Sequence, residues 1–75
     1  MNGKVKEGQN MIKVNGEEME WHLGMTVKDI LEAKKFIFPM IGVWINDKPI
    51  PRDKFETTVV NDGDDVQVIH MISGG

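Results

Sequence analysis

The first patterned part of the chain consists of two short segments in which apolar and polar residues alternate. Residues 11–15 and 17–23 place apolar side chains at every second position, as half-buried strands do: Ile12 and Val14, then Met19, Trp21 and Leu23. Asn15-Gly16 separates the segments and is the strongest two-residue signal for a hairpin, because both residues tolerate a positive φ. The pattern therefore predicts an antiparallel hairpin.

A short helix is predicted directly after the hairpin. Thr26 is a good N-cap, and Asp29 three residues later completes a capping box with a shortened acid. Met25 and Ile30 stand where the two members of a hydrophobic staple belong. We expect the helix to span residues 27–35 and to end at its two lysines, which suit the negative end of a helix.

Extended segments are predicted again in the second half of the chain. Alternation over residues 41–46 indicates a strand, whereas the two prolines within residues 49–52 restrict that segment to a sheet edge or a loop. A turn at residues 61–64 leads into a last strand over residues 65–71. The predicted order is two strands, one helix, a strand, an optional edge strand and a final strand.

This order predicts an α+β domain in which a mixed sheet of four to five strands carries one helix on one face. If the last strand lies in the centre of the sheet, parallel to the first, the domain has a β-grasp (ubiquitin-like) fold, which we expect. A ferredoxin-like fold would need a second helix, which the pattern lacks. The side chains predicted to form the core are Ile12, Val14, Val27, Ile30, Leu31, Val43, Ile45, Val66 and Val68.

Composition and charge limit the classes of function. We interpret the 75 residues as one domain, with a disordered leader at residues 1–10 and the folded part at residues 11–75. The net charge is −3 without a basic stripe, which argues against nucleic acid and anionic membranes as partners. No apolar stretch is long enough to span a bilayer and no signal peptide is visible, so we expect a cytoplasmic protein. We also expect the protein to be a monomer on its own. Asp62, Asp64 and Asp65 could face a basic partner, but we favour a solvated turn.

The sequence offers no candidate catalytic centre. It contains no cysteine, no Gly-rich phosphate loop and no cluster of metal ligands. His22 and His70 each stand alone in a strand pattern, where a solvent-facing side chain is the ordinary explanation. We therefore expect a protein that is not an enzyme and binds no cofactor or metal itself.

The informative feature is the C-terminal pair Gly74-Gly75. Because neither residue has a Cβ, such a tail is thin enough to enter a narrow active site, and no side chain crowds the terminal carboxylate. A carboxylate is a poor electrophile, so using it as an acyl donor requires ATP and an acyl-adenylate. Since the chain shows no ATP site of its own, we expect Gly75 to be the substrate of another protein. A frayed end is the plain alternative.

Residues 11–75 resemble the ThiS/MoaD family of sulfur carriers, and its ThiS branch most of all. The matching pieces are MIKVNGE at 11–17, MTVKDIL at 25–31, VWINDKPIPR at 43–52 and TTVVNDGDDVQVIHMISGG at 57–75. VNGE and NDGD are each common in hairpins, so the resemblance depends on the order of the pieces, their spacing and the terminal Gly-Gly. The chain departs from the pattern at Ser73, where many relatives have a third glycine, and in the unusually apolar segment KKFIFPMIGVW.

The resemblance implies a sulfur carrier of thiamine (thiazole) biosynthesis whose functional residues are Gly74 and Gly75. An E1-like enzyme of ThiF or MoeB type would adenylate the Gly75 carboxylate with ATP, and a persulfide donor would convert it into a thiocarboxylate. A thiazole synthase of ThiG type would receive the sulfur. The alternatives are sulfur delivery to molybdopterin or tRNA, ubiquitin-like protein modification, and a regulatory domain with an incidental Gly-Gly end.

An apolar partner surface is a further candidate site. Ile69 and Met71 are out of phase with the core residues of the last strand, as Trp44 is in its own strand, and Ile72 follows next to the tail. If the helix covers only one face of the sheet, these side chains form an exposed apolar surface. In the alternative arrangement, the loop at residues 36–40 folds over that face and buries them.

Overall fold

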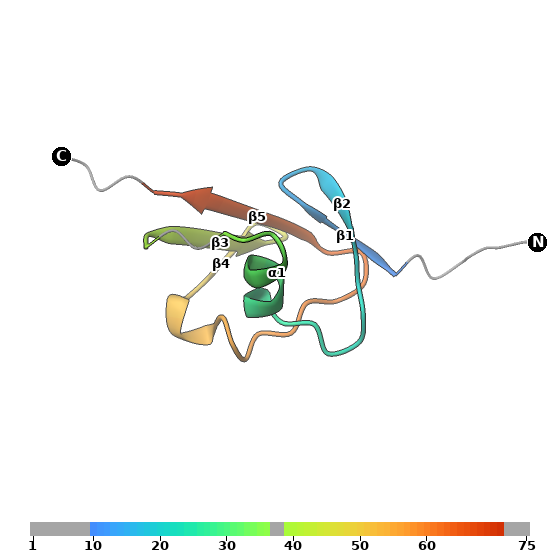
Figure 1. The fold of residues 1–75 in the computed structure, drawn as a ribbon. Coiled ribbons are helices and arrows are strands. Elements are labelled where there is room, and N and C mark those ends of the chain that lie inside the picture. Colours follow the sequence, from blue (N-terminus) through green and yellow to red (C-terminus); the bar gives the residue numbers. More distant parts are fainter. Residues whose placement is uncertain (1–9, 37–38, 72–75) are drawn as a thin grey trace, which may run out of the picture.

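Five strands form a single sheet in the order β2-β1-β5-β3-β4, and helix α1 lies against one face of it (Figure 1). This computed structural model describes residues 10–36 and 39–71. The predicted leader lies outside the described residues, apart from Asn10, and so do Ile72, Gly74 and Gly75.

The predicted hairpin is formed by β1 (Met11–Val14) and β2 (Glu17–Glu20), which pair antiparallel. Asn15 and Gly16 have φ values of 53° and 85°, and glycine enters this left-handed region without a steric penalty from a Cβ. The Asn-Gly pair thus forms the turn that its sequence predicts.

The second strand of the hairpin is shorter than predicted, because the chain turns toward the helix after Glu20. Met25 donates its N–H to the carbonyl oxygen of His22 (3.1 Å), and Gly24 between them has a φ of 85°. Leu23 lies in this turn and is 87% exposed, so the expectation that it joins the inward-facing side chains of β2 is wrong.

Helix α1 (Val27–Ala33) begins at the predicted capping box. Thr26 Oγ1 accepts a hydrogen bond from the Asp29 N–H (3.2 Å), and the Asp29 carboxylate accepts one from the Thr26 N–H (3.0 Å). Two backbone donors that the helix itself cannot satisfy are thereby paired, and the start of the helix is fixed.

The helix ends at Ala33, two residues before the predicted end at Lys35. Lys35 has a left-handed φ of 61°, and Phe36 donates its N–H to the Leu31 carbonyl oxygen (2.8 Å), which closes the helix in a Schellman arrangement. Leu31 is half-buried rather than buried as predicted. It follows Ile30 by about 100° around the helix, so both side chains cannot point at the sheet.

The central strand is β5 (Asp65–His70), as predicted for a β-grasp. It runs parallel to β1, where Val14 lies opposite Val66, and antiparallel to β3 (Ile41–Ile45). Strand β4 (Lys48–Ile50) pairs with β3 at the sheet edge, so the proline-containing segment has the edge position that its sequence required. The topology confirms the predicted fold class.

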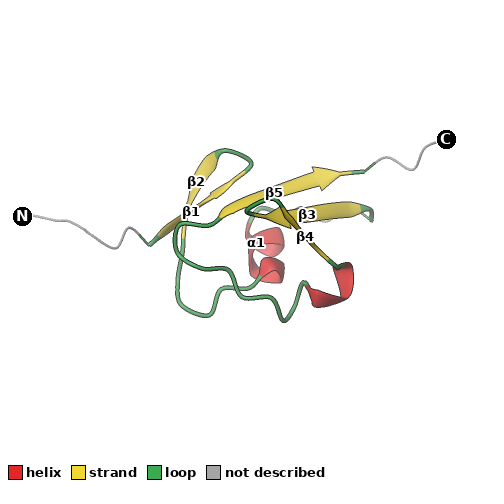
Figure 2. Cartoon of the chain, turned by 180° about the vertical axis from the view of Figure 1, so that it is seen from behind, coloured by secondary structure: helices red, strands yellow, loops and turns green. Residues whose placement is uncertain are grey.

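One face of the sheet is covered and the other is bare. Helix α1 and the connection between β4 and β5, which includes a 3₁₀ turn at Arg52–Lys54, lie on the same side of the sheet (Figure 2). An isolated bridge between Thr26 and Val59 ties this connection to the start of the helix. No element formed by the described residues lies over the opposite face.

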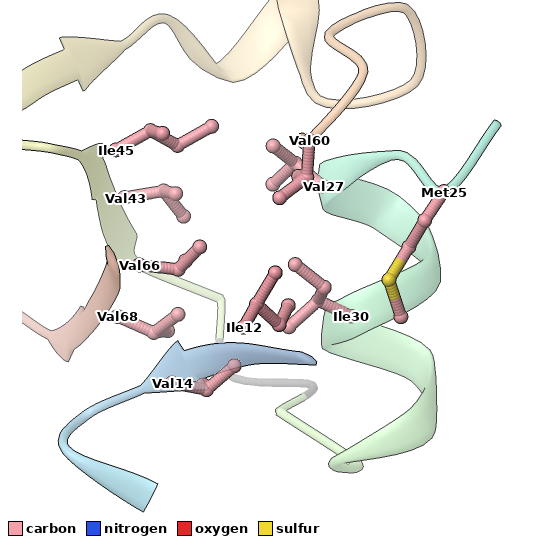
Figure 3. Close-up of a cluster of buried hydrophobic side chains, with 10 residues drawn as sticks. All are labelled: Ile12, Val14, Met25, Val27, Ile30, Val43, Ile45, Val60, Val66 and Val68. Carbon is pink, nitrogen blue, oxygen red and sulfur yellow. The ribbon is translucent and has the colours of Figure 1, made fainter. Parts of the chain in front are cut away.

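The core lies between the sheet and the helix (Figure 3). All of its buried side chains are apolar, namely Ile12, Val14, Met25, Val27, Ile30, Val43, Ile45, Val60, Val66 and Val68. The list of predicted core residues omitted Met25 and Val60, although the staple position had already marked Met25 as a partner of Ile30. No periodicity marks Val60, which lies outside the strands and the helix, and its N–H donates to the Met25 carbonyl oxygen (2.8 Å).

Candidate functional site at the end of the central strand

Strand β5 carries the chain toward the predicted functional C-terminus. The structure describes this path as far as Met71, so the roles of Ile72, Gly74 and Gly75 stay predictions. After the strand ends, the Met71 N–H donates to the carbonyl oxygen of Met40 (2.9 Å), the residue before β3. The chain therefore leaves the sheet from a defined position beside β3.

The apolar side chains around this position are exposed on the bare face. Ile69 is 47% exposed, Met71 42% and Met40 43%, and Trp44 is half-buried. Burial of Ile69 and Met71 beneath residues 36–40, the alternative left open by the sequence, is therefore not what the structure shows. Met40 was missed, because it follows a proline and belongs to no alternating segment.

Trp44 and Met71, which are 27 positions apart in the sequence, both approach Gly42. In the register of β3 and β5, Gly42 lies opposite Ile69 and Trp44 lies opposite Gln67. The Trp44 ring leans along its own strand over Gly42, and the terminal methyl group of Met71 reaches the same point. Trp44, Ile69 and Met71 thus form one continuous surface, here called the apolar patch.

The acidic residues lie at the other end of β5. The Asp62 carboxylate accepts hydrogen bonds from the N–H groups of Asn10 (3.1 Å) and Met11 (3.0 Å). Asp64 accepts from the Asn61 N–H (2.9 Å) and from Asn46 Nδ2 (2.9 Å). These bonds fix a turn and the start of β1, in agreement with the interpretation favoured from the sequence.

The remaining described residues show no second constellation for chemistry. Within residues 10–36 and 39–71, no three His, Cys, Asp or Glu side chains are placed to hold a metal ion. His22 is exposed, and its Nδ1 lies 3.3 Å from the carbonyl oxygen of Leu23. None of the helical segments in the described ranges has the length and apolar character that crossing a membrane requires.

The topology defines a ubiquitin-like β-grasp protein, in which the exposed apolar side chains Ile69 and Met71 lie at the end of the central strand. The family model described as the ThiS family matches residues 2–75. The chain therefore belongs to the ThiS family, which confirms the resemblance drawn from its motifs.

Individual relatives agree with this assignment. The crystal structure of the thiamine biosynthesis protein ThiS from Geobacter metallireducens superposes with a TM-score of 0.72 at 28% identity, covering 87% of this chain and 99% of that one. The uncharacterized protein ycf40 of Porphyra purpurea is 30% identical over 64 residues, which cover 85% of this chain and 90% of that protein. A thiazole synthase of Paramagnetospirillum magneticum is 31% identical over 62 residues, 83% of this chain but only 19% of that protein.

Proposed function

We propose that this ThiS-family protein is a sulfur carrier of thiamine biosynthesis, loaded at the C-terminal carboxylate of Gly75. Membership of the family and similarity to the Geobacter ThiS support a carrier in this pathway. The observation that carries the proposal is the exposed apolar patch at the end of the central strand β5, which the Gly-Gly end follows in the sequence.

The loading chemistry needs two partners. In an E1-like enzyme of ThiF type, the Gly75 carboxylate attacks the α-phosphorus of ATP, pyrophosphate leaves, and an acyl-adenylate forms. The terminal sulfur of a persulfide donor then attacks the acyl carbon and AMP leaves, which gives an acyl disulfide. A thiol cleaves its S–S bond, so that the thiol is oxidised to a disulfide and the Gly75 thiocarboxylate is released.

The apolar patch is the surface proposed to dock the activating enzyme. Trp44, Ile69 and Met71 lie at the end of β5, and Met71 is four residues before Gly75 in the sequence, so a partner that binds them would hold the chain close to its C-terminal carboxylate. Large apolar side chains surrounded by polar ones are also where binding energy concentrates in protein interfaces.

A thiazole synthase is proposed as the acceptor of the sulfur. Support comes from the Paramagnetospirillum protein of that name, which contains a segment similar to most of this chain within a much longer polypeptide. This segment makes up 19% of that protein, so its synthase activity belongs to the whole of it and is not transferred to this chain.

Intact-mass analysis tests the proposal. The full chain is incubated with ATP, a ThiF-type enzyme, a persulfide donor and a thiol reductant. We expect a mass gain of one oxygen-to-sulfur exchange, confined to the C-terminal peptide. A variant lacking Gly75 should abolish ATP–pyrophosphate exchange while its thermal midpoint stays unchanged, because a terminal residue beyond the last strand contributes little packing.

Three results would contradict parts of the proposal. Normal pyrophosphate exchange by the variant lacking Gly75 would exclude this carboxylate as the adenylated group. Adducts with lysine side chains of other proteins would favour a protein modifier instead of a carrier. If sulfur were transferred to a molybdopterin precursor or to tRNA, but not to a thiazole synthase, the protein would still be a sulfur carrier, and its assignment to thiamine biosynthesis would be wrong.

A further inference from the structure

Gly42 occupies a position in β3 where its backbone does not require glycine. Its φ lies outside the left-handed region that other residues avoid. The pairing of β3 with β5 also continues without a bulge from Ile41 to Ile45, and Gly42 lies directly opposite Ile69. Because glycine inside a strand weakens it, and neither a special φ nor a bulge explains it here, a close approach by other atoms is the remaining reason.

Two side chains make that approach. A Cβ at Gly42 would lie 2.7 Å from Cζ3 and 2.8 Å from Cη2 of Trp44, and 3.0 Å from Cε of Met71. Separations this short between carbon atoms are repulsive, so the ring would have to shift and the methyl group would have to give by a few tenths of an ångström. The missing side chain therefore leaves the space in which Trp44 and Met71 meet.

We infer that Gly42 is a positioning residue for the partner surface: it lets the Trp44 ring lie along β3 against Met71, which sets the shape of the apolar patch beside the tail. The inference rests on the proposed function, since it assigns to the patch the binding of the activating enzyme. A thioether group next to an aromatic ring makes a favourable contact, which would favour an arrangement with the two side chains together over Gly42.

The first test measures the arrangement itself, without any partner. Methyl-labelled methionine reports the Met71 signal by NMR, assigned through its loss in Met71→Leu. In the unchanged chain we expect this signal to be shifted by the ring current of Trp44. In Gly42→Ala it should move to the position seen in Trp44→Val, with an unchanged circular dichroism spectrum. An unshifted Met71 signal in the unchanged chain would overturn the inference.

The second test measures ATP–pyrophosphate exchange by a ThiF-type enzyme as a function of carrier concentration. Gly42→Ala should raise KM about fivefold or more, as the loss of a Trp contact at an interface does, with kcat within about twofold. Lys13→Ala, a change on β1 away from the patch, serves as the control and should leave both constants unchanged.

A double-mutant comparison identifies the cause. In the Trp44→Val background, Gly42→Ala should have no further effect on KM, because the ring that the new methyl group displaces is already absent. An equal effect in both backgrounds, or an unchanged KM in Gly42→Ala, would overturn the inference and leave the proposed function intact. Failure of the unchanged chain to support any exchange would instead refute the proposed function, and with it the role of Gly42 in binding.

Discussion

The two faces of the central strand show how differently the same kind of residue is used in this small domain. Val66 and Val68 point toward α1 and are 0% and 9% exposed, whereas Ile69, on the opposite face, is 47% exposed. Alternation along the strand places the two valines on one face of the sheet and Ile69 on the other. Which face is shielded from water depends on the elements that cover it. An apolar side chain on the bare face therefore adds little to stability and remains available to a partner.

The bare face is itself divided. Over β1 and β2 it carries charged side chains in register, with Lys13 opposite Glu18 on one side and beside Asp65 on the other. Over β3 and the end of β5 it carries the apolar patch. Ile69 and Met71 are thus exposed at the β3 side of this face, whereas the other exposed large apolar side chains of the described residues, Leu23, Met40 and Val59, lie outside the strands.

The largest effect on stability is expected on the covered face. Ile30→Ala should lower the free energy of unfolding by about 2–5 kcal/mol, because Ile30 is fully buried and the change leaves a cavity. Urea denaturation followed by circular dichroism measures the difference.

Ile69→Ala is the matched control on the bare face, since it removes the same atoms from a half-exposed side chain. Its cost should be about 1 kcal/mol or less. Equal costs for the two substitutions would show that the described difference between the faces has no energetic counterpart.

An intermediate effect is expected at the start of the helix that covers the core. Thr26→Ala removes the oxygen that accepts the Asp29 N–H and should cost about 1 kcal/mol. Thr26→Ser keeps that oxygen and should lose less than half as much in the same urea titration. If both variants were equally unstable, the hydroxyl group would not be the stabilising element.

Local patterns in the sequence were enough to predict most of the fold. Asn15-Gly16 and the pair Thr26 and Asp29 act through bonds between near neighbours, so their outcome depends little on the rest of the chain. The central, parallel position of β5 was predicted as the condition of the β-grasp fold, which the element order allowed and the family resemblance implied. The ends of the helix and strands were less predictable. Helix α1 ends early because Lys35 adopts a left-handed φ, and a lysine, unlike a glycine, does not indicate this conformation in the sequence.

The candidate site could be predicted only in part. Alternation separated Trp44, Ile69 and Met71 from the core, but it could not decide whether another segment covers them, because that depends on tertiary packing. The meeting of Trp44 with Met71 over Gly42 depends on strand register and ring orientation, which no local pattern specifies. The chemistry at Gly75 came from the family resemblance and the reactivity of a carboxylate.

Charging the apolar patch should affect binding far more than stability. Ile69→Glu should lower the free energy of unfolding by about 1 kcal/mol or less, as Ile69→Ala should, since the side chain is half-exposed on the bare face. The same substitution should raise KM for the activating enzyme about tenfold, because it places a charge in the proposed apolar contact. Met71→Glu should behave alike. Urea titration and ATP–pyrophosphate exchange on the same samples measure the two quantities.

Leu23→Glu is the control that distinguishes loss of a contact at the patch from a general effect of added negative charge on KM. Leu23 is 87% exposed in the turn before α1, so this change removes an equally apolar side chain and adds the same charge outside the patch. Its KM should match that of the unchanged chain within about twofold, as expected for a side chain that the enzyme does not touch. A similar rise in KM for Leu23→Glu and Ile69→Glu would mean that the enzyme responds to net charge alone. The bare face would then have no apolar docking surface, and the contrast between the two faces would concern stability only.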